Sequence, residues 1–113
     1  MQTLTHEQLK TMLDRHDDLV LINVLGQEPF EQAHIPGSYN IPVGERDFVQ
    51  HVEDTVGNKH SKVVVYCASF ECNASPTAAQ KLEQAGFSQV YDFEGGTKDW
   101  REAGYPLETS VSS

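Results

Sequence analysis

The stretch Lys62-Val63-Val64-Val65-Tyr66-Cys67 decides the fold. Its run of three valines is typical of a strand that is buried on both faces, as strands of parallel sheets are. A cysteine follows this strand directly. Ser75-Pro76 then predict a helix that begins nearby, with Ser75 as N-cap and Pro76 at the first helical position. A strand, a loop and a helix in this order form the repeating unit of α/β folds.

The same alternation continues on both sides of this stretch. A capping box formed by Thr5 and Gln8, followed by an apolar stripe, predicts a helix over 6–15. Gly86 is expected in a left-handed conformation at the end of the helix that begins near Ser75. Further helices are expected over 29–32, 45–56 and 97–103, and further strands over 19–25, 38–41 and 89–93. The fold class is therefore α/β: a single domain with a central, mainly parallel sheet flanked by helices on both faces.

Length and charge narrow the possible functions. The chain has 113 residues, which suits one domain over 1–107 and a short polar tail over 108–113 that is expected to fray. It carries 8 Lys and Arg against 17 Asp and Glu, a net charge of −9, which argues against nucleic acid or an anionic membrane as partner. No apolar run is long enough to span a bilayer, and no signal peptide is visible. Two cysteines without an export signal predict reduced thiols and a cytoplasmic protein.

Cys67 is the candidate nucleophile. It is followed by an active-site loop whose backbone N–H groups are expected to cradle negative sulfur: Ala68, Ser69, Phe70, Glu71, Cys72, Asn73, Ala74 and Ser75. These groups and the helix dipole favour the thiolate, so the pKa of Cys67 is predicted to lie below the free value of about 8.5. The alternative is an inert cysteine that packs at the end of a strand.

Two further motifs surround this cysteine in a recognisable order. Residues 30–38 read Phe-Glu-Gln-Ala-His-Ile-Pro-Gly-Ser, and residues 90–96 read Val-Tyr-Asp-Phe-Glu-Gly-Gly, with Trp100 shortly after. With Val65-Tyr66-Cys67 between them, they resemble the signatures of the rhodanese-like sulfurtransferase domain over most of the chain. The resemblance implies that Cys67 takes a sulfane sulfur from a donor as a persulfide and passes it to a thiol acceptor. No cofactor and no metal is expected.

The sequence departs from that family at the site itself. The loop 68–75 contains no Arg or Lys, although the family carries an arginine there, and it is about two residues longer than the common form. The first strand ends Asn23-Val24-Leu25 where the family has Asp-Val-Arg. A cation and a carboxylate are thus both expected to be absent near the site, and Glu71 opposes a dianion. We therefore expect weak thiosulfate activity, with a persulfide, a polysulfide or a partner protein as donor.

The role of Cys72 decides between different classes of function, and the sequence does not fix that role. As a resolving thiol it would make Cys67 and Cys72 a dithiol–disulfide redox module, and as a packing residue it would leave a simple sulfur carrier. A rhodanese-like binding or regulatory domain without catalysis is the third reading, since the loop arginine is missing. A phosphatase or arsenate reductase is less consistent with that absence, because a phosphoryl transition state needs the positive charge. Zinc is not expected, because the histidines have no recognisable ligand spacing.

The remaining candidates are interpreted as structural. By the resemblance, His34 hydrogen-bonds backbone rather than acting as a base, and Gly95-Gly96 forms a tight turn near the rim of the site. Trp100 is expected in the core. The other histidines are expected to be solvated on helices or loops: His6, His16, His51 and His60.

Overall fold

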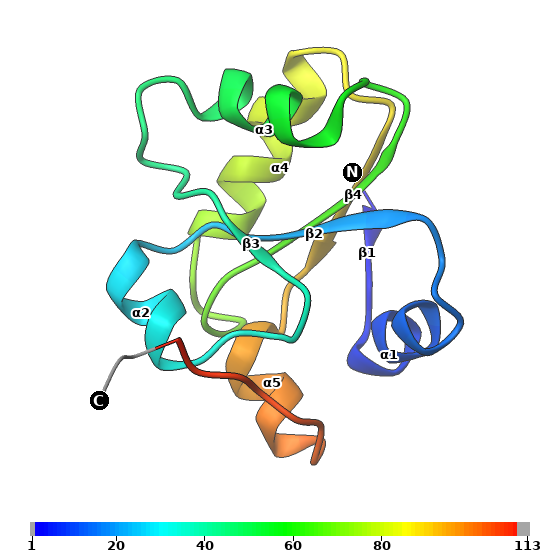
Figure 1. Cartoon of the computed structure of the whole chain (residues 1–113), viewed down its shortest axis with the longest axis vertical. Coiled ribbons are helices and arrows are strands. Elements are labelled where there is room, and N and C mark those ends of the chain that lie inside the picture. The colour runs from blue at the N-terminus through cyan, green and yellow to red at the C-terminus, as the bar shows by residue number, and fades with distance from the viewer. Residues whose placement is uncertain (1, 111–113) are drawn as a thin grey trace.

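The computed structural model describes residues 2–110 and contains one five-stranded parallel sheet in the order β1-β5-β4-β2-β3 (Figure 1). The strands are β1 Gln2–Thr3, β2 Leu19–Asn23, β3 Tyr39–Asn40, β4 Lys62–Tyr66 and β5 Gln89–Phe93. The helices are α1 His6–Asp14, α2 Gln27–Gln32, α3 Phe48–Val56, α4 Ala74–Gln84 and α5 Gly96–Glu102. The α/β fold class with a parallel sheet is confirmed.

Alternating side chains of the central strands build one core on each face of the sheet. Val63 and Val65 of β4 pack with α3 and α4, and Cys67 continues this face beyond the strand. Val64 and Tyr66 pack on the opposite face, where Leu9 of α1 and Trp100 of α5 cover them. Figure 1 shows α3 and α4 above the sheet and α1 and α5 below it. Helices on both faces explain why the consecutive valines Val63, Val64 and Val65 of β4 are all buried.

Several predicted elements agree with the structure in their bounds or capping residues. Thr5 caps α1, and its side chain and that of Gln8 form the reciprocal capping box. Both β4 and β5 have the predicted bounds. Gly86 has φ +99°, and the Phe87 amide donates to the Leu82 carbonyl at 3.1 Å, which closes the end of α4 as expected.

The predicted starts of four helices need correction. α4 begins at Ala74 with Asn73 as N-cap, so Ser75 does not cap it and Pro76 is its third residue. Pro29 is likewise the third residue of α2, which begins at Gln27. The first four amides of a helix have no partner within it, so proline fits at the third position as well as at the first. α3 begins at Phe48 rather than near 45, and α5 at Gly96 rather than 97.

The edges of the fold carry contacts that the sequence did not predict. β1 is a two-residue strand beside β5, and the tail is partly held. Glu108 forms an antiparallel bridge with His34, and the Ser110 amide donates to the Glu31 carbonyl at 2.7 Å. Residues 111–113 of the expected tail lie outside the described residues.

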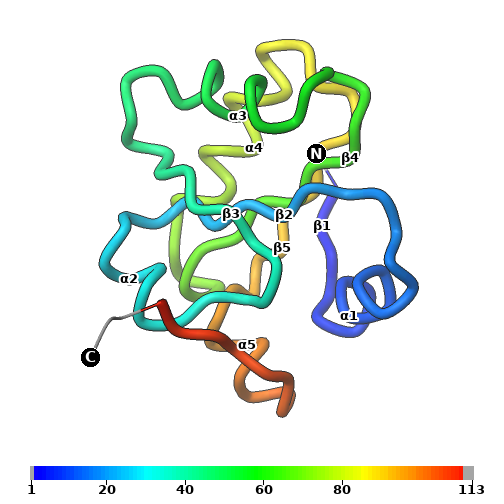
Figure 2. Tube along the Cα trace, viewed as in Figure 1, coloured from blue at the N-terminus to red at the C-terminus, as the bar shows by residue number. Residues whose placement is uncertain are grey.

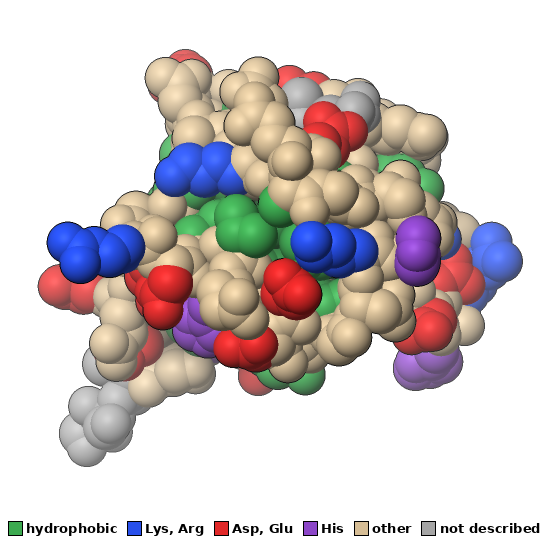
Figure 3. Space-filling model, turned by 90° about the horizontal axis from the view of Figure 1, so that it is seen from above, with side chains coloured by type: hydrophobic (Ala, Val, Ile, Leu, Met, Phe, Trp, Pro, Cys, Tyr) green, Lys and Arg blue, Asp and Glu red, His purple; other side chains and the backbone are tan. Residues whose placement is uncertain are grey.

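On the face shown in Figure 3, acidic and basic side chains are interspersed around a small apolar area. This face therefore carries no large patch of charge of one sign. Among residues 2–110, no helix has the length and apolar character needed to cross a membrane. Figure 2 shows that the loop between β4 and α4 (green) runs close to the start of α5 (orange). These two segments are far apart in the sequence. That meeting of two segments forms the site.

Candidate functional site

Cys67 lies at the carboxyl end of β4, beneath its own loop. Its side chain is completely buried (0% exposed). The Sγ atom lies 3.5 Å from the Ser75 hydroxyl and 3.7 Å from the Cys72 carbonyl oxygen, and both can accept its proton. Ser75 is therefore a contact of the thiol rather than a helix cap.

The start of α5 holds the loop in place. The Thr97 amide donates to the Cys67 carbonyl at 3.0 Å, and the Lys98 amide donates to the Ala68 carbonyl at 2.9 Å. Gly96 has φ +65°, and a Cβ atom there would collide with the Cys67 carbonyl oxygen. Gly95-Gly96 is thus more than the tight turn that the resemblance implies, because Gly96 is the first residue of α5 and lets two backbones touch.

The acidity of Cys67 differs from the sequence-based prediction. Burial raises the pKa of the Cys67 thiol, and the neighbouring Cys72 side chain raises it further, while hydrogen bonds from the Ser75 side chain and amide oppose the rise. The prediction of a lowered pKa is wrong, because desolvation of a completely buried thiolate outweighs the favourable amides.

Cys72 has the more acidic thiol. Burial raises its pKa, but hydrogen bonds from the Cys67 side chain and from the amides of Ala74 and Ala68 outweigh this, so the pKa of Cys72 is lowered. The Asp92 carboxylate adds a smaller opposing effect. The loop amides therefore converge on Cys72 more than on Cys67. Cys67 and Cys72 are both free thiols.

A carboxyl group lies under the loop, where the sequence led us to expect none. Asp92 of β5 is 1% exposed, and its Oδ1 atom has no hydrogen-bond partner among the described residues. Burial raises the pKa of Asp92, and a hydrogen bond from the Ser75 side chain partly offsets the rise. The signal was present in the sequence, since β-strand alternation places Asp92 on the same face as Val90.

A cation also lies at the rim, contrary to expectation. Lys98 of α5 lines a hollow of about 90 Å³ together with Ser69, Phe70 and Glu71 of the loop. Three carboxylates line the same hollow, those of Glu71, Asp99 and Glu102, so its balance of charge is negative. Phe70 is 69% exposed at the tip of the loop.

His34 and Tyr66 hold the neighbouring turn in place through hydrogen bonds to its backbone. His34 Nδ1 donates to the Phe30 carbonyl at 2.8 Å, and the Tyr66 hydroxyl accepts from the Ile35 amide at 3.0 Å. The structural role predicted for His34 is confirmed. Trp100 is buried, as expected, with its indole N–H donating to the Pro106 carbonyl at 2.9 Å.

Three of the four histidines expected to be solvated have side-chain partners. His6 lies 3.1 Å from the Asp99 carboxylate, and His51 lies 2.9 Å from that of Glu45. His60 lies 3.3 Å from the Ser88 hydroxyl. Within residues 2–110, no three His, Cys, Asp or Glu side chains are grouped as metal ligands.

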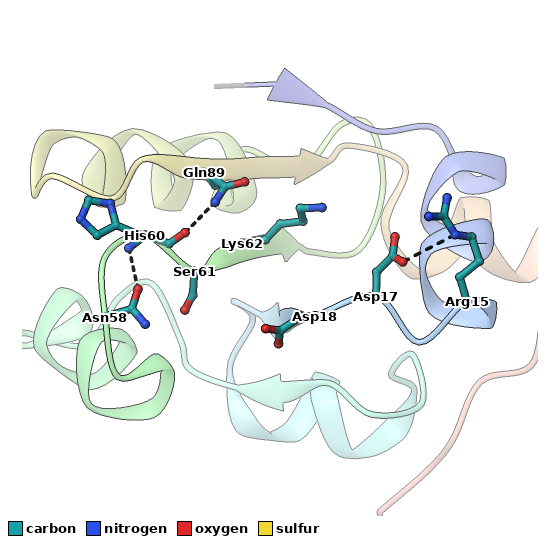
Figure 4. A pocket seen from close by; sticks show the side chains of 8 residues that line it. All are labelled: Arg15, Asp17, Asp18, Asn58, His60, Ser61, Lys62 and Gln89. Carbon is teal, nitrogen blue, oxygen red and sulfur yellow. Dashed lines mark hydrogen bonds and ion pairs between the residues drawn. The ribbon is translucent and has the colours of Figure 1, made fainter.

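A wider cavity of about 530 Å³ lies elsewhere, at the amino ends of the strands (Figure 4). Lys62 begins β4 and Gln89 begins β5, and both line it together with Asp17 and Asp18. Ligands of parallel sheets bind beyond the carboxyl ends of the strands, which is the opposite edge. Cys67 does not line this cavity.

Comparisons with known proteins agree on one family. The model of the rhodanese-like domain matches residues 5–103. A thiosulfate sulfurtransferase GlpE of Pseudomonas syringae is 34% identical over 96 residues, which is 84% of this chain and 83% of that protein. A putative sulfur carrier protein YrkF of Bacillus subtilis is 30% identical over 94 residues, 83% of this chain.

The chain spans only 48% of the length of the Bacillus subtilis protein. A crystal structure of a thiosulfate sulfurtransferase from Pseudomonas aeruginosa superposes with a TM-score of 0.85 at 25% identity, covering 99% of this chain and 21% of that one. The shared part is therefore one domain that also occurs within longer proteins.

Proposed function

Because the chain belongs to the rhodanese-like domain family, we propose that it is a sulfurtransferase that carries sulfane sulfur as a persulfide on Cys67. The observation that carries the proposal is the position of Cys67 at the carboxyl end of β4, in contact with the hydroxyl and the amide of Ser75. Hydrogen-bond donors at this point stabilise a negative sulfur atom.

The reaction is an exchange of sulfur–sulfur bonds. The Cys67 thiolate attacks the outer sulfur of a donor persulfide, the donor's sulfur–sulfur bond breaks, and the donor thiolate leaves with the electron pair. An acceptor thiolate then attacks the outer sulfur of the Cys67 persulfide and regenerates the Cys67 thiolate. Since Cys67 is completely buried, the loop 68–73 must move before either partner reaches it.

The charges at the rim favour a persulfide, a polysulfide or a partner protein as donor over thiosulfate. Glu71, Asp99 and Glu102 outnumber Lys98 around the hollow, and the net charge of the chain is −9. A dianion gains little at such a surface, whereas a protein donor can bind through surface contacts such as the exposed Phe70. Two free thiols suit the reducing cytoplasm, where we place the protein.

The test is intact-protein mass spectrometry of the full chain after exposure to polysulfide or thiosulfate. We expect one added sulfur atom in the wild type and in Cys72→Ser, and none in Cys67→Ser, with polysulfide acting faster than thiosulfate. A Cys67 that stays unmodified with both donors would contradict sulfur transfer and support a binding domain without catalysis.

The contact between the two cysteines favours a second candidate function, the dithiol–disulfide module. The Cys72 thiolate would attack the inner sulfur of the Cys67 persulfide, form the Cys67–Cys72 disulfide and expel hydrosulfide, and an external thiol would then reduce the disulfide. In the same experiment, this function predicts sulfide release and a disulfide in the wild type, while Cys72→Ser keeps its persulfide. A wild-type persulfide as long-lived as that of Cys72→Ser would exclude it.

A further inference from the structure

Phe70 is a large apolar side chain that the fold leaves exposed at the tip of the loop over Cys67. It is 69% exposed, and in the described part of the chain only one other large hydrophobic side chain, that of Tyr39, is also exposed. The Cys72 amide donates to the Ser69 carbonyl at 3.1 Å, which closes a turn with Phe70 inside it. The Cys72 carbonyl oxygen of the same turn lies 3.7 Å from Cys67 Sγ. Phe70 therefore projects into water from the segment that covers the thiol.

The hollow between this turn and α5 is lined mainly by negative charge. Glu71 of the turn and Glu102 of α5 are both exposed, and neither forms an ion pair with another described residue. The third carboxylate, that of Asp99, lies 3.1 Å from His6. Lys98 is the cation among the lining residues. The exposed aromatic ring is thus flanked by two carboxylates that are available to a positively charged partner.

The dimensions of the hollow favour a protein over a small molecule as the occupant of this surface. Its volume of about 90 Å³ is small, whereas pockets that enclose small ligands measure roughly 300–1,000 Å³. One side chain of a partner fits there, and the remaining contacts form around it. Exposed aromatic rings contribute much of the binding energy of protein interfaces. The net charge of −9 attracts a basic surface from a distance.

We propose that Phe70, Glu71 and Glu102 form a docking surface for a donor protein whose persulfide-bearing segment combines apolar and basic side chains. Phe70 packs against the apolar side chains of that segment, and its Lys or Arg side chains pair with the two glutamates. Lys98 lies among them, so the negative charge of the persulfide does not face carboxylates alone. The inference rests on the proposed function of Cys67 and adds the class of donor to it.

The test is the binding of three short synthetic peptides to the full chain, measured by the fluorescence anisotropy of a label that all three share. Each peptide has a central serine in place of the persulfide cysteine. The first has leucine and lysine on both sides of the serine, the second has leucine and glutamate, and the third has serine and lysine. We expect the leucine–lysine peptide to bind at least about tenfold more tightly than either of the others, and less tightly as salt is added.

Two pairs of variants locate the binding of the leucine–lysine peptide. Phe70→Ser should weaken it at least about fivefold, whereas Tyr39→Ser, which removes the other exposed large hydrophobic side chain, should stay within about twofold of the wild type. Glu102→Gln should weaken binding severalfold at low salt. Asp54→Asn on α3 changes the net charge equally and should have a smaller effect.

The outcomes separate the docking surface from the reaction, because a serine peptide binds without sulfur transfer. Equal binding of the three peptides, or equal losses within each pair of variants, would overturn the docking surface even if Cys67 takes up sulfur from polysulfide. Selective binding that depends on Phe70 would support the surface even if Cys67 takes up no sulfur, and the proposed reaction would then fail alone. Absence of binding by the leucine–lysine peptide would also overturn the surface.

Discussion

The two ends of the parallel sheet differ in a way that cavity size does not reveal. At the amino ends lies the open cavity of about 530 Å³, where Arg15 pairs with Asp17 at 3.6 Å (Figure 4). Lys62, which also lines this cavity, lies 5.9 Å from the centre of the Tyr91 ring. At the carboxyl ends the hollow measures only about 90 Å³. There, however, Asp92 is buried, and its Oδ1 atom has no hydrogen-bond partner within residues 2–110.

Solvent explains the difference between the two ends. The charged side chains at the amino end line an open cavity, and ion pairs at such a surface contribute little to stability. Beneath the loop at the carboxyl end, burial raises the pKa of both Cys67 and Asp92. Chemistry in this molecule is therefore expected where polar groups are desolvated, rather than at the wider cavity of the amino ends.

Replacing Gly96 by alanine is expected to disrupt the site at the carboxyl ends of the strands most strongly. The position has φ +65°, and the added Cβ would meet the Cys67 carbonyl oxygen. We expect Gly96→Ala to cost about 3 kcal/mol or more of unfolding free energy, from backbone strain and displacement of the loop. Urea denaturation measures the loss, and Cys67 alkylation should change with it. Wild-type stability together with wild-type reactivity would show that the loop does not depend on this close approach.

Gly86→Ala, just after the C-terminal end of α4, is the matched control for Gly96→Ala. Gly86 also has a left-handed conformation, φ +99°, but the nearest atom to an added Cβ is in the flexible Lys59 side chain at 3.7 Å. The expected loss is about 1 kcal/mol by the same denaturation measurement, with no change in Cys67 alkylation. A loss as large as that of Gly96→Ala would mean that backbone conformation, and not the contact with Cys67, dominates both.

These two glycines show what a sequence can predict. The left-handed Gly86 was predictable because it follows a helix directly and precedes the apolar Phe87, which is a local pattern. The contact of Gly96 with Cys67 joins residues 29 positions apart in the sequence and depends on how α5 meets the loop. β4 and β5 were predictable because their strand patterns are also local in the sequence. The two-residue β1 was not predictable, because it forms only by pairing with β5.

The candidate site divides in the same way. Cys67 could be placed from its strand and the motifs around it. The direction of its pKa could not, because the predicted effect of the amides is local and burial by the whole fold outweighs it. Asp92 and Lys98 reach the site from β5 and α5, so an inspection of the loop 68–75 alone misses them.

Reversing the charge of Glu71 sharpens the comparison at the carboxyl end. Glu71→Arg replaces an exposed carboxylate at the hollow by a guanidinium, so thiosulfate uptake should rise severalfold, more at low salt than at high salt. Single-turnover sulfur uptake at two ionic strengths measures this. Asp54→Arg on α3 changes the net charge equally and is the control. An equal response of both variants would assign donor choice to the overall charge rather than to the hollow.

The smallest effect is expected at the wide cavity. Lys62→Ala removes a cation that lies over the Tyr91 ring at the amino end, so the unfolding free energy should change by no more than about 0.5 kcal/mol. Sulfur uptake by Cys67 should stay unchanged, whereas Lys98→Ala should lower it severalfold for anionic donors, because Lys98 is the cation among the residues that line the hollow. Both variants lose one positive charge, so their difference isolates position. If Lys62→Ala slowed uptake as much as Lys98→Ala does, the amino end would be part of the donor's path and the contrast between the two ends would fail.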